Sequence, residues 1–439
     1  MSTRLVTPTT HARRDIRCDV GDAMVANLAI HFVFFFDRAL DVDKLRQSFA
    51  RTLDSYFIFG GRLTVVAGRM AIRCRGRGVP FTIVASPRNL LEAMRATADD
   101  TGQWLVDPVN GTTERLGVGP LCRIQITRLA DDATAIGVSW HHVIGDMRTF
   151  MMFMNAWAAS FADRPVSTPL IVDDRAAYVA ARLPDSGTAE PGVRCLSPTE
   201  TVRSVWYLAK NARRQRTVSM YFADSEIDRI RGAYGRRARL SVNDVVCAHV
   251  AEALMSLDRA VSRRTLAIAV DIRDRCGLDA SLVGNILTTL HVDLRRGDDA
   301  ITIAQRVRDT VDHFADHHSD MRANQHFVDG LGAWQAARVV STAFDPRRWN
   351  PLVTNLSGFD VHDIVFDGAR PVFCTQVLKL PVAGLGALMD GAGGRGMVFI
   401  MSLPPEEFAA LTTPQMRAHL HRFRRPDDEI PWVHRKIHL

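Results

Sequence analysis

The stretch GVSWHHVIGDMRTF, residues 137–150, carries two adjacent histidines at the end of an apolar run and an aspartate four positions after the second. Neighbouring side chains of a strand point to opposite faces, so His141 and His142 do not both enter one site if the strand continues. The chain passes here from a predicted strand into a predicted helix, where functional residues often gather. Two interpretations are open on these residues alone: a working histidine, or two structural histidines and a helix-capping Asp146.

The segments on either side predict a mixed α/β architecture, because period-2 and continuous apolar runs alternate with runs of helical spacing. A glycine-bounded hairpin is expected at 60–74, and a pair of strands is expected around the turn Asp131-Asp132 within 121–140. Further strands are predicted at 27–36, 217–223, 265–273, 286–294 and 397–403. Helices are predicted at 41–56, 148–162, 241–254 and 300–318.

The chain length and a fading periodicity predict two domains. The chain has 439 residues, 47% of them hydrophobic, which is enough for more than one core. Between 163 and 215 the sequence becomes rich in Pro, Ser, Gly and Asp. We therefore expect an N-terminal domain at 1–165, a crossover linker at 166–215 and a C-terminal domain at 216–439.

Composition narrows the class of protein. The net charge of +7 is spread over the chain, and its short basic clusters are not interleaved with aromatic residues, which argues against nucleic-acid binding. No run of about 18 apolar residues predicts a membrane span. Seven cysteines without a CxxC pair, and an N-terminus without the apolar core of a signal peptide, predict free thiols and a cytoplasmic location.

Two short patterns match known binding motifs, but we interpret neither of them as a binding site. GAGGRG (391–396) fits GxGxxG, but it lies between two predicted strands, so we expect a hairpin rather than a dinucleotide site. His313 and His317 are four apart in a polar helix, and we expect a solvated face and no metal site. GxSxG and the phosphate-binding GxxxxGK[ST] are both absent from the sequence.

The order of motifs along the chain resembles that of the BAHD acyltransferases. His142-x3-Asp146 matches their HxxxD signature, Gly61-Arg62-Leu63 resembles an early GRL element, and VDIRDRCGLDASLVGN (270–285) resembles vdvRsR…fGN. FMMFMNAWA, SVNDVVCAHVAEAL and GMVFIMSLPPEEFAAL resemble further elements, so the resemblance covers nearly the whole chain. VFDGARP (365–371) stands where DFGWG is usual, and Met147 stands where a glycine is usual.

The resemblance implies two chloramphenicol acetyltransferase-like domains, each a mixed sheet flanked by helices, with a tunnel at their interface. It implies transfer of an acyl group from acyl-CoA, a co-substrate rather than a bound cofactor, to a hydroxyl or amine of a small molecule. His142 would be the general base, without an acyl-enzyme, since a neutral imidazole can accept the acceptor's proton. His141 would orient the loop, and Asp146 would pair with Arg273.

The remaining site assignments also come from the resemblance. Thr354 would donate to the oxyanion, with Asn355 as the fallback, while Arg370 and Ser241 would contact the co-substrate. We expect a monomer without a metal. Two alternatives stay open: a condensation-type enzyme that takes its acyl group from a carrier protein, which the broken HHxxxDG pattern at Met147 disfavours, and a non-catalytic binding protein of the same fold.

Overall fold

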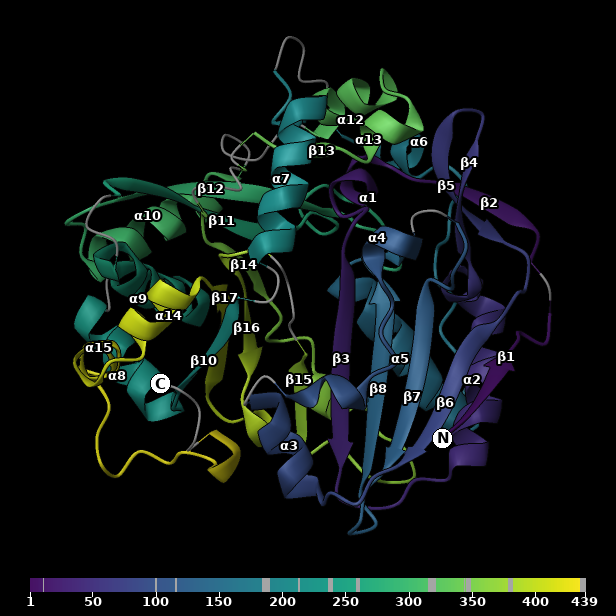
Figure 1. The fold of residues 1–439 in the computed structure, drawn as a ribbon, viewed down its shortest axis with the longest axis horizontal. Helices are drawn as coiled ribbons and strands as arrows, with labels where there is room; N and C mark the ends of the chain where they lie inside the picture. The colour runs from purple at the N-terminus through teal and green to yellow at the C-terminus, as the bar shows by residue number, and fades with distance from the viewer. Residues whose placement is uncertain are drawn as a thin grey trace.

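The protein is built on two six-stranded β-sheets with helices packed against them (Figure 1). The computed structural model describes residues 1–10, 12–98, 101–114, 117–183, 190–211, 214–235, 240–257, 261–314, 321–342, 344, 349–377 and 382–434. The strands of the first sheet, in spatial order, are β1 (Ser2–Val6), β6 (Val79–Ala85), β7 (Cys122–Arg128), β8 (Thr134–His141), β3 (Ala29–Phe36) and β15 (Phe373–Gln376). Those of the second are β10 (Arg216–Phe222), β17 (Met397–Leu403), β16 (Leu385–Asp390), β14 (Leu352–Asn355), β11 (Arg263–Asp271) and β12 (Leu287–Arg295). The expected mixed α/β class is confirmed.

Two smaller sheets and a set of helices complete the described part of the chain. The small sheets are formed by β2 (Arg14–Arg17), β5 (Arg69–Cys74) and β4 (Arg62–Val66), and by β13 (Val339–Ser341) and β9 (Val193–Cys195). The helices of the first half are α1 (Val20–Met24), α2 (Val42–Ser55), α3 (Leu90–Ala98), α4 (Gly111–Glu114), α5 (Met147–Phe161), α6 (Arg175–Ala180) and α7 (Pro198–Asn211). Those of the second half are α8 (Asp224–Tyr234), α9 (Val242–Leu257), α10 (Ala300–Asp312), α12 (Met321–Asp329), α13 (Ala333–Ala336), α14 (Pro405–Leu411) and α15 (Pro414–Leu420).

The first core lies between the first sheet and the helices α2 and α5, which pack against each other. The apolar stripe of α5 is fully buried there, as its helical spacing predicts. The indole of Trp157 also donates to the carbonyl oxygen of Leu45 and the hydroxyl of Ser48, both at 3.1 Å, so it ties α5 to α2 with no unpaired polar atom. This packing fixes the position of the N-terminus of α5, where Asp146 lies.

The second core lies between the second sheet and α9, with α10, α14 and α15 packed on α9. The predicted capping box at the start of α9 is present: Ser241 N–H donates to the Asp244 carboxylate at 2.7 Å, and Asp244 N–H donates to the Ser241 hydroxyl at 3.2 Å. Residues 391–396 form the expected hairpin between β16 and β17, closed by Gly391 N–H donating to Gly396 O at 3.0 Å.

The predicted domain limits need two corrections. The segment 166–215 is more than a linker, because it contains α6, β9 and α7, which its composition, rich in Pro, Ser, Gly and Asp, did not reveal. The range 216–439 is not confined to the second sheet either, since β15 crosses over and pairs with β3 at the edge of the first. Four residues of β15 thereby join the two halves, which composition alone does not reveal.

The described residues hold no group of three or more His, Cys, Asp or Glu side chains arranged for a metal ion. Within them His313 follows the last turn of α10, and its Nδ1 lies 2.9 Å from the carbonyl oxygen of Asp309, while His317 lies outside the described residues. Among the described helices, none is long and apolar enough to cross a membrane.

Candidate active site

The two histidines lie where β8 ends and α5 begins. β8 runs to His141, a single 3-10 turn covers His142–Ile144, and Asp146 caps α5 by accepting from Thr149 N–H at 3.0 Å. Gly145 allows this tight connection, because a Cβ there would come within 2.5 Å of the Thr149 side chain. The chain therefore turns at His142, and the two imidazoles face different surroundings.

His141 is fully buried and holds the turn. Its Nε2 lies 3.0 Å from the carbonyl oxygen of Gly111, and its Nδ1 accepts from Val143 N–H at 3.3 Å. An imidazole that donates from Nε2 and accepts at Nδ1 is neutral, and both of its nitrogens are engaged by backbone. These contacts place His141 in the turn, and its role in orienting the loop stays a prediction.

His142 is held by Asn285 from the second half of the chain. Its Nδ1 lies 2.9 Å from Asn285 Oδ1, and Asn285 Nδ2 donates to the carbonyl oxygen of His142 and to Asp22 Oδ1, both at 2.8 Å. Because both acceptors of Nδ2 are oxygens, the orientation of the amide is fixed and Oδ1 faces the imidazole. Nδ1 must then carry the proton, which leaves Nε2 as the basic nitrogen.

The environment of His142 keeps its imidazole neutral. Burial lowers the pKa of His142 from its ordinary value of 6.5, although the ring is not fully enclosed. The charge of Asp146 and the hydrogen bond that His142 donates to Asn285 oppose this decrease. A neutral imidazole with a fixed tautomer is the form that can accept a proton at neutral pH.

Asp22 accepts a hydrogen bond from Asn285, and Arg175 forms an ion pair with Asp22. Their side chains are almost completely buried, and Arg175 pairs with Asp22 at 2.8 Å. Arg175 also donates to the carbonyl oxygens of Val143 at 3.3 Å and Ile144 at 3.5 Å, within the turn that carries His142. Burial raises the pKa of Asp22, and the guanidinium of Arg175 counteracts that rise. The pair anchors both the amide and the turn, so α1 and α6 belong to the site.

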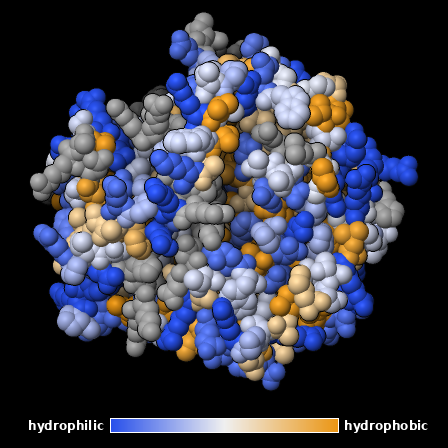
Figure 2. Space-filling view, in the orientation of Figure 1, coloured by the Kyte–Doolittle hydropathy of each residue, from blue (hydrophilic) through white to orange (hydrophobic). Residues whose placement is uncertain are grey.

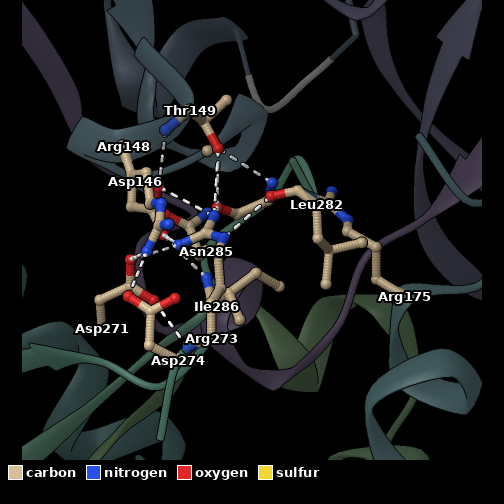
Figure 3. Close-up of polar contacts among 12 residues, drawn as sticks. Asp146, Arg148, Thr149, Arg175, Asp271, Arg273, Asp274, Leu282, Asn285 and Ile286 are labelled. Carbon is tan, nitrogen blue, oxygen red and sulfur yellow. Dashed lines mark hydrogen bonds and ion pairs between the residues drawn. The ribbon is translucent and has the colours of Figure 1, made fainter. Parts of the chain in front are cut away.

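Asp146 pairs with Arg273 (Figure 3). Arg273 donates to the two carboxylate oxygens at 2.9 and 3.2 Å, and Ile286 N–H donates to the same carboxylate at 3.0 Å. Arg273 is fully buried, and it also donates to the carbonyl oxygens of Leu282 at 3.0 Å and Gly284 at 3.2 Å. Among the described residues, no hydrogen bond joins Asp146 to the imidazole of His142. The predicted ion pair between the two halves is therefore present.

In the described part of the chain, no hydrogen bond or ion pair joins the other predicted site residues to this network. Thr354 is half-buried in β14, between Ala269 of β11 and Ala387 of β16 in the register of the second sheet. The amide oxygen of Asn355 accepts from the N–H of Ser357 at 2.9 Å and from its hydroxyl at 2.7 Å. A role of Thr354 at the reacting atoms stays a prediction.

The two residues predicted to contact a co-substrate have partners of their own. Arg370 is exposed and paired with Asp363, and Ser241 is engaged in the capping box of α9. Their contact with a co-substrate stays a prediction. A pocket lies between the halves, lined by Thr97 and Ala98 of α3 and by residues of β10, β15, β16 and β17. It does not include His142, so the tunnel past His142 also stays a prediction.

Sequence reasoning did not assign functional roles to three members of the network: Asp22, Arg175 and Asn285. Asn285 lies in the stretch 270–285, which carries the family resemblance but no chemical signal of its own. Arg175 lies in the segment that has the composition of a linker. Asp22 had a visible local signal, since Asp19 and Asp22 have capping-box spacing, and both hydrogen bonds of that box are present. Its pairing with Arg175, far along the chain, could not be read from that spacing.

Comparison with known proteins gives whole-chain matches. A family model described as "Transferase family" matches residues 1–416. Hydroxycinnamoyltransferase 2 of Oryza sativa subsp. japonica is 25% identical over 445 residues, which cover 92% of this chain and 93% of that relative. Rosmarinate synthase of Plectranthus scutellarioides is 27% identical over 159 residues, and the chain spans 36% of the length of that relative.

Solved structures match the whole fold at low identity. Vinorine synthase aligns with a TM-score of 0.71 at 18% identity, over 93% of this chain and 95% of its own. TRI101 of F. sporotrichioides, solved with coenzyme A and T-2, aligns with a TM-score of 0.73 at 12% identity, over 92% of this chain and 98% of its own. These likenesses confirm the expected chloramphenicol acetyltransferase-like fold.

Proposed function

The chain belongs to the transferase family of BAHD acyltransferases, and on that premise we propose that it moves an acyl group from acyl-CoA to a hydroxyl or amine of a small molecule. One observation carries the proposal: the amide of Asn285 fixes the Nδ1–H tautomer of His142 and leaves Nε2 free to act as a base. A purely structural histidine would have both nitrogens engaged, as His141 does.

The proposed reaction needs one base and no covalent acyl-enzyme. Nε2 of His142 takes the proton of the acceptor hydroxyl or amine as its oxygen or nitrogen attacks the thioester carbonyl carbon. The tetrahedral intermediate then collapses, the carbon–sulfur bond breaks, and the imidazolium returns the proton to the departing thiolate. The products are an ester or amide and free CoA, so atoms and charge balance without a metal or a redox partner.

Two features of the site support this chemistry. The imidazolium that forms between the two proton transfers would be stabilised by the Asn285 amide oxygen at Nδ1 and by the nearby charge of Asp146, both of which favour the protonated ring. The network that positions His142 joins residues 22, 142 and 285 within one chain, and we retain the monomer as the proposed functional unit. We retain Thr354 as the proposed donor to the oxyanion.

The fold likeness to TRI101 with bound coenzyme A supports CoA as the donor, and the family's relatives support a small-molecule acceptor. The sequence disfavours the carrier-protein alternative, because Met147 interrupts the HHxxxDG pattern. The acyl chain and the acceptor are left to experiment.

The test is mass spectrometry of the purified protein incubated with a panel of acyl-CoAs and candidate alcohols and amines. The proposal expects an acylated acceptor and an equal amount of free CoA for at least one pair, without any carrier protein. Turnover only when the acyl group is supplied on a carrier protein would instead support the condensation-type alternative. Ligand binding without any turnover, unchanged by His142→Ala, would support a binding protein.

A further inference from the structure

The helix α7 exposes an apolar stripe that nothing in the described part of the chain covers. Val202, Val205 and Trp206 lie at spacings of three and four residues and are 69%, 60% and 63% exposed. The opposite side of the helix faces the protein, since Ser204 is buried and Tyr207 and Leu208 are half-buried. In Figures 1 and 2, α7 lies along the surface at the junction of the two halves, with hydrophobic residues on its outer side.

Basic residues flank this stripe. Arg203 and Lys210 are exposed, and on a helical projection both fall next to Trp206, on one edge of the apolar stripe. The ammonium group of Lys210 lies 5.0 Å from the centre of the Trp206 ring. Beyond the helix the chain continues with Arg213, Arg214 and Arg216.

Few acidic residues are available in this part of the sequence to balance the positive charge. Between residues 198 and 216, Glu200 is the only acidic residue, and it is already used by the N-terminal capping box with Ser197 and by an ion pair with Arg194 at 2.8 Å. The outer surface of α7 therefore combines exposed apolar side chains, one of them tryptophan, with the charges of Arg203 and Lys210, which form no ion pair with any described residue.

We propose that α7 docks this protein on an anionic lipid surface. A helix with an apolar stripe, a tryptophan beside it and lysine or arginine along its edge is the arrangement that lies in the plane of a membrane interface. The apolar stripe enters the boundary between headgroups and acyl chains, while Arg203 and Lys210 meet anionic headgroups. The protein is attached at its surface by this helix and does not span the bilayer.

The charge selects this occupant over a second copy of the chain. Two copies joined antiparallel through α7 would bring their basic edges to the same side of the contact, and like charges oppose such a contact. An anionic lipid surface complements the same edges. The stripe is also short, and three exposed apolar side chains give a reversible attachment that depends on electrostatic attraction.

The experiment is sedimentation of the full-length protein with phosphatidylcholine vesicles, with and without about a third phosphatidylserine. We expect binding to the anionic vesicles, much weaker binding to the neutral ones, and release as salt rises, because screening shortens the range of the attraction. Replacing the stripe (V202S/V205S/W206S) or the basic edge (R203Q/K210Q) should lower the partition coefficient about tenfold or more.

Matched controls separate docking from general charge and hydrophobicity. L5S/V118S removes two other exposed apolar side chains, which are 58% and 83% exposed, and R4Q/R128Q removes two exposed arginines elsewhere. Both should bind vesicles like the wild type, and all variants should keep the circular dichroism of the wild type. Absence of vesicle binding at low salt, or equal binding by the α7 variants and their controls, would overturn the proposal. A dimer in gel filtration that V202S/V205S/W206S dissolves would also overturn it, because the stripe would then be a contact between copies.

Discussion

Arg273 donates hydrogen bonds to both oxygens of the Asp146 carboxylate, at 2.9 and 3.2 Å, across the boundary between the two halves of the chain. The aspartate of the HxxxD motif is therefore not the partner of the histidine. It caps α5 and ties the turn that carries His142 to Arg273 and Ile286, in the connection between β11 and β12. The hydrogen-bond partner of the histidine is Asn285 instead, so the two motif residues have separate roles.

Arg273→Ala should lower the free energy of unfolding by about 3–5 kcal/mol, because it leaves the buried Asp146 carboxylate without its cation. Asp146→Asn should cost less, because Arg273 keeps a second ion pair with Asp271 at 3.0 Å. Activity should fall together with stability. The double variant should be less damaged than the sum of the two, since the residues are in direct contact. Chemical denaturation of the four proteins measures this coupling.

The control for that cycle is Asp43→Asn, which breaks an exposed pair with Arg46 at 2.7 Å and should cost no more than about 1 kcal/mol. If Asp146→Asn unfolds like the wild type and yet loses all turnover, Asp146 acts in the chemistry and the structural role is wrong.

Asn285→Leu should lower kcat by about 10- to 100-fold with little change in KM, because His142 loses the acceptor that fixes its tautomer. The same change should move the acidic limb of the pH profile to lower pH, since the hydrogen bond that His142 donates to Asn285 raises the pKa of His142. Steady-state kinetics across pH measures both effects. A variant with lower activity and an unmoved limb would show that Asn285 only supports the fold.

Thr354→Val should reduce kcat about 10²- to 10³-fold if its hydroxyl donates to the oxyanion, the usual loss for one such donor. Thr354→Ser keeps a hydroxyl and should retain most of the rate. Initial rates of CoA release distinguish the two variants. Equal rates for the Val and Ser variants would remove Thr354 from the site and turn attention to other donors.

The pH dependence of kcat/KM should show an acidic limb below about 6.5. Burial lowers the pKa of His142, so the neutral base persists to lower pH than a free imidazole would, and activity is lost only as pH falls through that lowered value. Rates in overlapping buffers, with circular dichroism at each pH as a check of folding, give the limb. A limb above 7 would mean that the working base is not this buried imidazole.

Much of the fold followed from local pattern. The apolar stripe of α5, the hairpins and the capping box of α9 are local features, and each lies where its periodicity or turn residues predict it. The crossover of β15 into the first sheet did not follow, because a four-residue strand has no periodicity to reveal and its pairing with β3 is a long-range contact.

The site residues also separate into those that the sequence located and those that only the folded chain brings together. The resemblance to HxxxD proteins located His142 and Asp146 and supplied Arg273, whose pairing is now seen. The residues that support His142 could not be assigned from the sequence, because Asp22, Arg175 and Asn285 meet only in the folded chain. Asp22 and Asn285, for example, are 263 residues apart in the sequence. Arg175 in particular comes from a segment whose composition resembles that of a linker.

The central claim is that Nε2 of His142 is the base that carries the transfer. Its most direct test is the initial rate of CoA release by His142→Ala, measured beside the wild type and His141→Asn with a donor–acceptor pair that the wild type turns over. We predict a loss of roughly 10²–10⁴-fold for His142→Ala, with a melting temperature near that of the wild type, and a milder loss for His141→Asn. A folded His142→Ala that keeps its rate, while a folded His141→Asn loses turnover, would contradict the account.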